Sequence, residues 1–191
     1  MNRRLLAFFI LYFVVSSIVI LSQYNRNNLY ENIINAEVSN NLNSMIKNFQ
    51  RAEKQIEATL QSKKMNMRTL QVFRDLSAEM NKVEYYMLKL ENKPIENKTA
   101  EVLFNIRKDL EYIQGDKEVL ILKEEEIVKI EKIYGLIQIL NSTIEEYRDE
   151  IDYQINELEI INNDTWINSI QSLNDSIEEN DNYLYFLNID D

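Results

Sequence analysis

The side chains best suited to chemistry in this sequence are carboxylates, which gather in two places. Lys123 is followed by three glutamates, Glu124–Glu126. Three acids at the start of a helix complement the positive end of its dipole, so this group needs no metal ion to explain it. The second group falls largely opposite the apolar stripe of a predicted helix and comprises Glu145, Glu146, Asp149, Glu150 and Asp152. Because glycosidase carboxylates must converge across a cleft, we interpret these acids as a solvated helix face.

The residue types that are missing exclude several kinds of site. The sequence contains no Cys and no His. It therefore lacks the thiolate nucleophile, the disulfide, the commonest metal ligands and the usual proton shuttle near neutral pH. The two glycines, Gly115 and Gly135, cannot form a phosphate-binding loop of the known types. We predict a protein that is not an enzyme, with no cofactor and no metal site.

Aromatic side chains in the last part of the chain are the candidate partner-binding residues. The single tryptophan, Trp166, is expected to be a packing anchor first, although interfaces are also enriched in Trp. Residues 181–191 form a tail in which aromatic and aliphatic residues precede two acids. Because an exposed aromatic patch is a liability in a monomer, we favour a tail that folds back over one that meets a partner. The candidate set is Trp166, Tyr183, Tyr185, Phe186 and Leu187.

Most of the chain shows the periodicity of amphipathic helices. Apolar residues recur at every third or fourth position, which indicates helices with one buried face. These segments run over about 29–60, 67–90, 102–113, 127–161 and 167–177. Polar residues 61–66, the region around Pro94, and Gly115-Asp116 are the predicted connections. The segment 127–161 is predicted to be the longest uninterrupted helix, and Leu120–Leu122 to be a short strand or a docking loop.

The first apolar stretch is long enough to suggest a membrane anchor. Leu5–Leu21 carries no charge, and a helix of about 20 such residues spans a bilayer. Arg3 and Arg4 precede it, so the positive-inside rule predicts a cytoplasmic stub over 1–4 and an extracytoplasmic remainder. A cleaved signal peptide is less favoured, because Ile20 and Leu21 do not suit a cleavage site. The sequence thus predicts a single-pass membrane protein with a signal anchor over 5–22.

These features define an all-α protein. We predict a transmembrane helix followed by an extracytoplasmic antiparallel helical bundle over 23–180, with long helices like those of coiled coils, and the tail over 181–191. The net charge of −11 argues against nucleic acid as a partner. The expected partner is another protein. Whether the stripe of the 127–161 helix is satisfied within the chain or by a second copy, giving a homo-oligomer, is left open.

Four short motifs occur in an order that resembles a known family. They are Met65–Arg68 opening the second helix, Asn97–Glu101 opening the third, Leu122–Glu126 leading into a long helix, and Asn162–Trp166 near its end. Their arrangement resembles the N-terminal region of the YpeB-type spore germination proteins. The resemblance implies a non-catalytic protein at a spore membrane that supports a cortex-lytic enzyme. Larger family members continue into C-terminal repeat domains, which this sequence lacks.

Two functional hypotheses follow. The first is a membrane-anchored interaction or scaffold protein of the bacterial cell envelope, whose partner would be a cell-wall lytic enzyme if the resemblance holds. The alternative is an extracytoplasmic sensory module that binds a small molecule between helices. Because only about four residues precede the predicted anchor, such a sensor would need a partner protein to carry its signal.

Overall fold

The computed structural model describes residues 3–91, 98–156, 160 and 164–180; the side chains of 3–11, 84, 87–91 and 156 are not included. The described chain is almost entirely helical, which confirms the all-α prediction at the level of secondary structure. The helices are α1 (Arg3–Ser62), α2 (Met67–Glu91), α3 (Lys98–Gln114), α4 (Glu124–Glu146), α5 (Arg148–Asn156) and α6 (Thr165–Glu179). Two short strands, β1 (Lys64–Asn66) and β2 (Val119–Ile121), join them.

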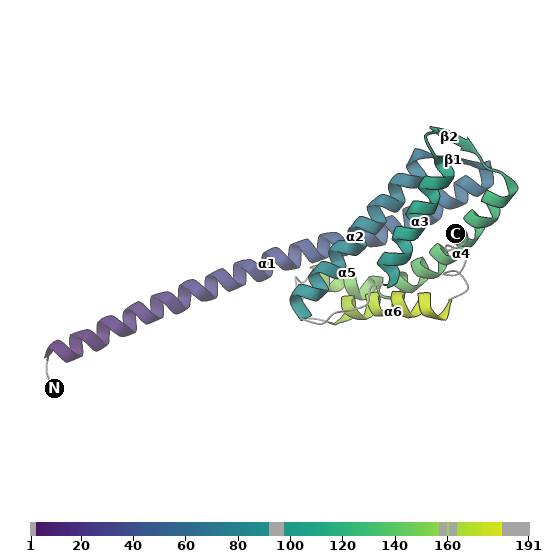
Figure 1. The fold of residues 1–191 in the computed structure, drawn as a ribbon. Helices are drawn as coiled ribbons and strands as arrows, with labels where there is room; N and C mark the ends of the chain where they lie inside the picture. The colour runs from purple at the N-terminus through teal and green to yellow at the C-terminus, as the bar shows by residue number, and fades with distance from the viewer. Residues whose placement is uncertain (1–2, 92–97, 157–159, 161–163, 181–191) are drawn as a thin grey trace.

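The core lies between the second half of α1 and the helices that follow. α1 packs against α2 and α4, α2 packs against α3, and α6 lies across α4 and α3 at the base of the bundle (Figure 1). Each helix buries the apolar face that its periodicity predicts. Fully buried members of these faces include Phe49, Phe73, Leu103, Ile137 and Leu173.

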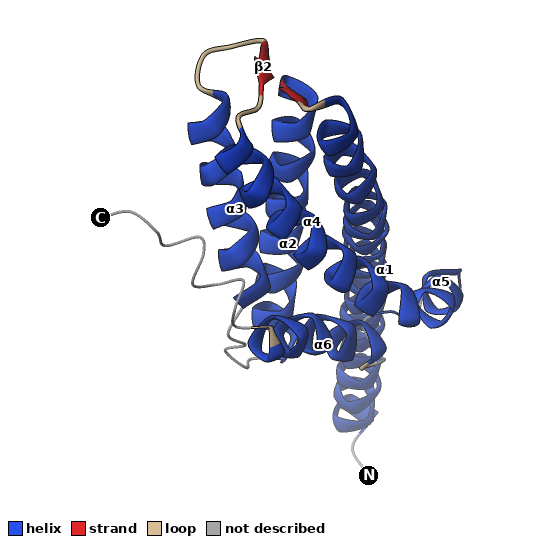
Figure 2. Cartoon of the chain, turned by 90° about the vertical axis from the view of Figure 1, so that its right-hand side faces the viewer, coloured by secondary structure: helices blue, strands red, loops and turns tan. Residues whose placement is uncertain are grey.

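A two-stranded antiparallel ribbon closes the end of the bundle farthest from the N-terminus. β1 pairs with β2, with Lys64 opposite Ile121, Met65 opposite Leu120 and Asn66 opposite Val119 (Figure 2). We call this region the distal end: it comprises the turn from α1 to α2 and the connection from α3 to α4, residues 62–67 and 115–124. The sequence predicted a turn over 61–66 and so missed β1. The short strand considered over Leu120–Leu122 is confirmed for its first two residues.

The predicted helix over 127–161 is interrupted, and that prediction was wrong. α4 ends at Glu146, Tyr147 adopts φ −95° and ψ −5°, and α5 begins at Arg148. The Tyr147 N–H bonds to the Ile144 carbonyl at 3.2 Å, which tightens the last turn of α4. Its hydroxyl lies 2.6 Å from Ser172 Oγ on α6, so the residue at the break also contacts α6. α1, with 60 residues, is longer than any other described helix.

The predicted membrane anchor is not supported. α1 runs without interruption from Arg3 and projects from the bundle, and its side chains from Tyr12 to Leu21 are largely exposed. Among the residues that the structure describes, no helix combines the length and apolar character needed to cross a membrane. The side chains of residues 5–11 lie outside the described part. The predictions of a transmembrane helix over 5–22 and of a single-pass membrane protein are corrected accordingly.

Candidate interaction surface

Exposed apolar side chains gather at the distal end. Beyond α1, eight large hydrophobic residues of the described chain are exposed. Five of them belong to the distal end or to the helix turns next to it: Met67, Tyr112, Val119, Ile121 and Val128. Tyr112 is 89% exposed and Ile121 is 71% exposed. Because the part of the described chain beyond α1 buries most of its apolar residues, such a cluster is typical of a protein interaction site.

Buried residues that alternate with exposed ones anchor the ribbon to the core. Met65 is fully buried and Leu120 nearly so, whereas Lys64, Val119 and Ile121 are exposed. This is the alternation expected of a strand pair with one buried face. The ribbon therefore holds Val119 and Ile121 outward in a fixed orientation.

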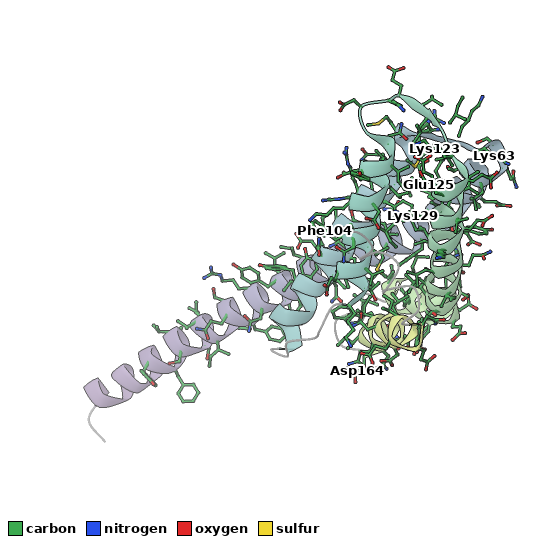
Figure 3. The ribbon with its side chains drawn as sticks, turned by 45° about the vertical axis from the view of Figure 1, so that its right-hand side comes forward. Lys63, Phe104, Lys123, Glu125, Lys129 and Asp164 are labelled. Atoms are coloured by element: carbon green, nitrogen blue, oxygen red, sulfur yellow. The ribbon has the colours of Figure 1, made fainter. Side chains whose placement is uncertain are left out.

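Side chains at the helix starts fix the ends of the ribbon. The Asn66 side-chain oxygen accepts a hydrogen bond from the Arg68 N–H at 2.9 Å, which caps α2. The Lys123 N–H donates to Glu126 Oε2 at 2.6 Å, where α4 begins. The acids 124–126 thus act in helix initiation, as predicted. Figure 3 shows Lys63, Lys123 and Glu125 together at this end of the molecule.

A cavity of about 510 Å³ lies beside the ribbon. Its lining residues are Met67, Leu70, Arg74, Glu111, Gly115, Asp116, Lys117 and Glu118. Arg74 Nε lies 2.9 Å from Glu111 Oε1, and Arg107 Nε lies 3.8 Å from the same oxygen. The Glu111 carboxylate therefore offsets the positive charge that the cavity would present to an anion.

The outer face of α3 continues the cluster toward the base. Phe104 has the Arg107 guanidinium 4.7 Å and the Lys108 ammonium 4.6 Å from its ring centroid. Tyr112 follows Lys108 by one helical turn. The face therefore combines aromatic and cationic groups, which are common at protein interfaces.

One carboxyl group beneath this face is perturbed. Burial raises the pKa of Asp109 on α3 above its ordinary value, and the positive charge of Lys129 on α4 opposes that shift. Desolvation is the larger cause, because the carboxylate loses hydration and the charge of Lys129 compensates only in part. The group faces a neighbouring helix, so we read the shift as a consequence of packing.

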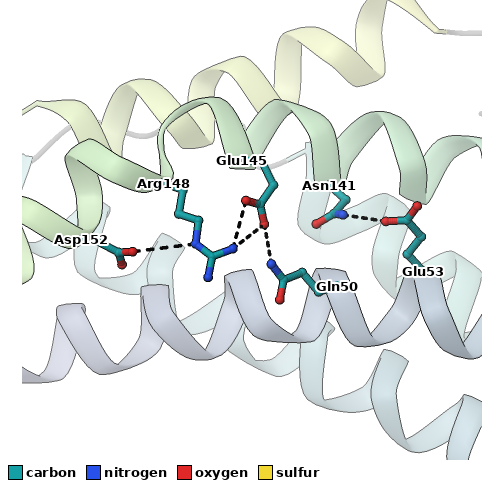
Figure 4. Close-up of polar contacts among 6 residues, drawn as sticks. All are labelled: Gln50, Glu53, Asn141, Glu145, Arg148 and Asp152. Carbon is teal, nitrogen blue, oxygen red and sulfur yellow. Dashed lines mark hydrogen bonds and ion pairs between the residues drawn. The ribbon is translucent and has the colours of Figure 1, made fainter.

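Of the acids predicted to form a solvated face, Glu146, Asp149 and Glu150 are exposed, as expected, whereas Glu145 and Asp152 are half-buried and take part in polar contacts. Glu145 accepts a hydrogen bond from Gln50 on α1 at 2.6 Å and lies 3.1 Å from Arg148 Nη1 (Figure 4). Asp152 lies 3.8 Å from Arg148 Nε. The hydrogen bond to Glu145 raises the pKa of Arg148 further above its ordinary value. Glu145 thus joins α1 to α4, whereas the Arg148–Asp152 pair lies within α5. The described residues contain no group of three or more acids placed to hold a metal ion.

Trp166 lies in the core of the bundle. Its side chain is fully buried on α6, and its indole N–H has no hydrogen-bond partner among the described residues. In this conformation it offers a partner no surface, so a role in partner binding stays a prediction. The other candidates, Tyr183, Tyr185, Phe186 and Leu187, lie outside the described residues.

The exposed apolar side chains at the distal end were not predicted from the sequence. Val119 and Ile121 form part of a short apolar run, and Tyr112 and Val128 fall outside the helical stripes. The only available signal was that Leu120–Leu122 had no helical period, which left the strand alternative open. Exposure at this end depends on a pairing between segments more than 50 residues apart.

Comparison with known proteins finds no significant match to this chain. No protein-family model matches the sequence, no curated protein matches it significantly, and no solved structure matches the fold significantly. The resemblance to the YpeB-type proteins therefore stays a prediction.

Proposed function

We propose that this chain is a non-catalytic interaction protein that binds another protein through the distal end of its helical bundle. The observation that carries the proposal is the clustering of Met67, Tyr112, Val119, Ile121 and Val128 at one end, exposed on a rigid support. Interfaces of this kind depend on a few aromatic and aliphatic anchors surrounded by polar groups. The bundle positions these anchors, and the ribbon fixes their orientation.

The first partner to test is a cell-wall lytic enzyme. This choice comes from the resemblance to the YpeB-type proteins, whose members support such an enzyme of the spore cortex. The net charge of −11 is compatible with a protein partner and unfavourable for nucleic acid. In this proposal the chain acts as a scaffold, and the partner supplies any catalytic activity.

The sensory alternative has less support from the geometry. The cavity beside the ribbon falls in the size range of small-molecule sites, about 300 to 1,000 Å³. Arg74 is already paired with Glu111 at its wall, however, and much of its lining is charged and exposed. A sensory site is expected to have a mostly apolar, enclosing wall with few polar groups.

The test is affinity purification of the full-length chain from its own cells, in growth and in sporulation, with bound proteins identified by mass spectrometry. The key variant is Tyr112→Asp at the distal end, and its matched control is Tyr153→Asp on α5, where the tyrosine is 64% exposed. We expect the wild type and the control to recover a lytic enzyme from sporulating cells. Tyr112→Asp should recover about tenfold less, because a charge in a desolvated anchor position costs more than 1.4 kcal/mol. Equal recovery by both variants would place the binding surface elsewhere.

A further inference from the structure

The two edges of the ribbon differ in how their backbone groups are used. The Leu122 N–H donates to the Lys63 carbonyl at 3.0 Å, so residues 63 and 122 form a hydrogen-bonded pair. In an antiparallel ladder such pairs alternate along the strands. Met65 and Leu120 are therefore the next bonded pair, and the N–H and C=O groups of Val119 and Ile121 point away from β1.

The outer edge of β1 is partly occupied, whereas that of β2 is open. The Lys64 N–H, which points away from β2, donates to Ser62 Oγ at 3.3 Å. Between described residues, no backbone hydrogen bond outside the ribbon involves the N–H or C=O of Val119 or Ile121. An open edge of this kind is a template for another strand.

Side chains around the open edge add a chemical preference. Val119 and Ile121 expose β-branched side chains that would pack against similar residues on an added strand. Lys64 lies opposite Ile121 on the same outer face, and Lys63 precedes it. Both lysines are exposed, and neither forms an ion pair with a described residue. These two lysines on β1 place positive charge on the outer face beside Ile121, and Glu124–Glu126 lie beyond it at the start of α4, so an acidic residue is favoured only on the side toward β1.

The conformation of Lys63 is unusual for its residue type. It has φ 52°, in the left-handed region that favours glycine, and Lys has no local advantage there. Lys63 directly follows the end of α1, and its N–H donates to the Leu60 carbonyl at 3.3 Å, so the left-handed residue ends the helix. This turn places a cationic side chain beside the ribbon.

We propose that the open edge of β2 binds an extended segment of the partner protein by strand addition, with apolar side chains against Val119 and Ile121 and an acidic residue toward Lys63 and Lys64. This inference rests on the proposed function and specifies the partner's chemistry. Backbone hydrogen bonds would supply affinity, and alternating side chains would supply specificity. A helical partner would leave the outward N–H and C=O groups unpaired.

The test uses the full-length chain and a short end-blocked peptide in which valine and threonine alternate and one end carries aspartates. Binding is followed by fluorescence anisotropy, and amide hydrogen exchange is followed at Val119 and Ile121. We expect binding with a dissociation constant below about 1 mM and slower exchange at both amides. No binding at that concentration would overturn the proposal.

Ile121→Pro is the decisive variant, because it removes an outward N–H and no hydrogen bond of the ribbon. We expect peptide affinity to fall about tenfold. Ile121→Thr, which keeps the N–H and the branched side chain, should bind within about threefold of the wild type. Thermal melts by circular dichroism identify any loss of fold, and Leu122→Pro, which breaks the bond to Lys63, provides a reference for a damaged ribbon. Undiminished binding by a folded Ile121→Pro would overturn strand addition.

Two lysine variants test the charge preference. Lys64→Glu should weaken binding of the acidic peptide about threefold and strengthen binding of a peptide with lysines in place of the aspartates. Lys63→Gly should raise the thermal midpoint, because glycine relieves the left-handed strain, while weakening the acidic peptide. Equal binding of both peptides by the wild type would contradict the acidic preference.

The purification described for the proposed function separates the two ideas. If Ile121→Pro still recovers the partner and Tyr112→Asp does not, the distal end binds a partner without strand addition. Sedimentation of the wild type tests a second copy as the occupant. Self-association that Ile121→Pro abolishes would assign the edge to a homodimer and overturn the proposed partner.

Discussion

Trp166 is the largest fully buried side chain of the described core, which makes its contribution measurable. Replacing it by alanine removes a large apolar group and leaves a cavity, so we expect Trp166→Ala to lower the free energy of unfolding by about 3 to 5 kcal/mol. Chemical denaturation followed by circular dichroism measures this. A loss below about 1 kcal/mol would show that the side chain is not packed as described.

The Asp109 carboxyl makes the stability of the fold depend on pH. Because burial raises its pKa in the folded state, folding favours the protonated carboxyl, and the stability from this group is lost as the pH rises from its unfolded value through its folded value. We expect Asp109→Asn to raise the thermal midpoint slightly at pH 7 and to have no such effect at acid pH below the unfolded pKa. Thermal melts across pH measure the difference. A stabilisation that does not change with pH would contradict this sign.

The sequence predicted side-chain environments well where a residue belonged to a regular stripe. Leu70, Phe73 and Leu76 were expected to be buried and are. The exposure of Val119 and Ile121 was not predicted, because an apolar run of four residues, Val119–Leu122, is too short for its period to show which members are buried.

At the scale of elements, one buried side chain joins two helices. Asn174 Oδ1 on α6 accepts hydrogen bonds from the Thr99 N–H at 3.0 Å and from its hydroxyl at 2.8 Å. Both residues are buried, so these bonds satisfy the first turn of α3 in a place that water does not reach.

Removing this acceptor should weaken the contact between α3 and α6. We expect Asn174→Ala to cost about 1 to 3 kcal/mol, because it leaves two buried donors unsatisfied. The control is Asn168→Ala on the exposed face of the same helix, which should change stability by less than about 0.5 kcal/mol. Denaturant melts of both variants compare them. Equal costs would mean that helix propensity, and not the buried acceptor, determines the effect.

Element boundaries show why the rest of the fold was not predictable. The break at Tyr147 leaves the apolar spacing of 127–161 intact, since both α4 and α5 continue it. At the break the Tyr147 hydroxyl meets Ser172, a contact between distant positions. The ribbon likewise requires Lys64–Asn66 and Val119–Ile121 to be brought together by helices. Neither the contact of Tyr147 with Ser172 nor the pairing of the two strands can be predicted from local periodicity.

At the scale of the whole molecule, the fold divides into a bundle and a projecting part of α1. The large apolar side chains of α1 from Tyr12 to Ile33 are mostly exposed, and burial of the large apolar residues begins near Val38. α1 continues without interruption from Arg3 into the bundle. The hydropathy of the first apolar stretch predicted a membrane span, and the described helix does not support that prediction.

The division predicts that the projecting part contributes little to the stability of the bundle. Deletion of residues 1–30 should change the thermal midpoint by less than about 3 °C, since few described contacts are lost. Circular dichroism of the shortened and full-length chains measures this, with sedimentation to compare their masses. A fall of more than about 10 °C would show that these residues are packed against the bundle or against a second copy.

The central claim is that the distal end binds a partner protein. The most direct test is amide hydrogen exchange of the full-length chain, alone and bound to the partner recovered by affinity purification. The account predicts slower exchange at residues 63–66, at the end of α3 around Tyr112 and at 119–121, with α5 unchanged. Protection confined to α5, α6 or the projecting part of α1 would contradict it.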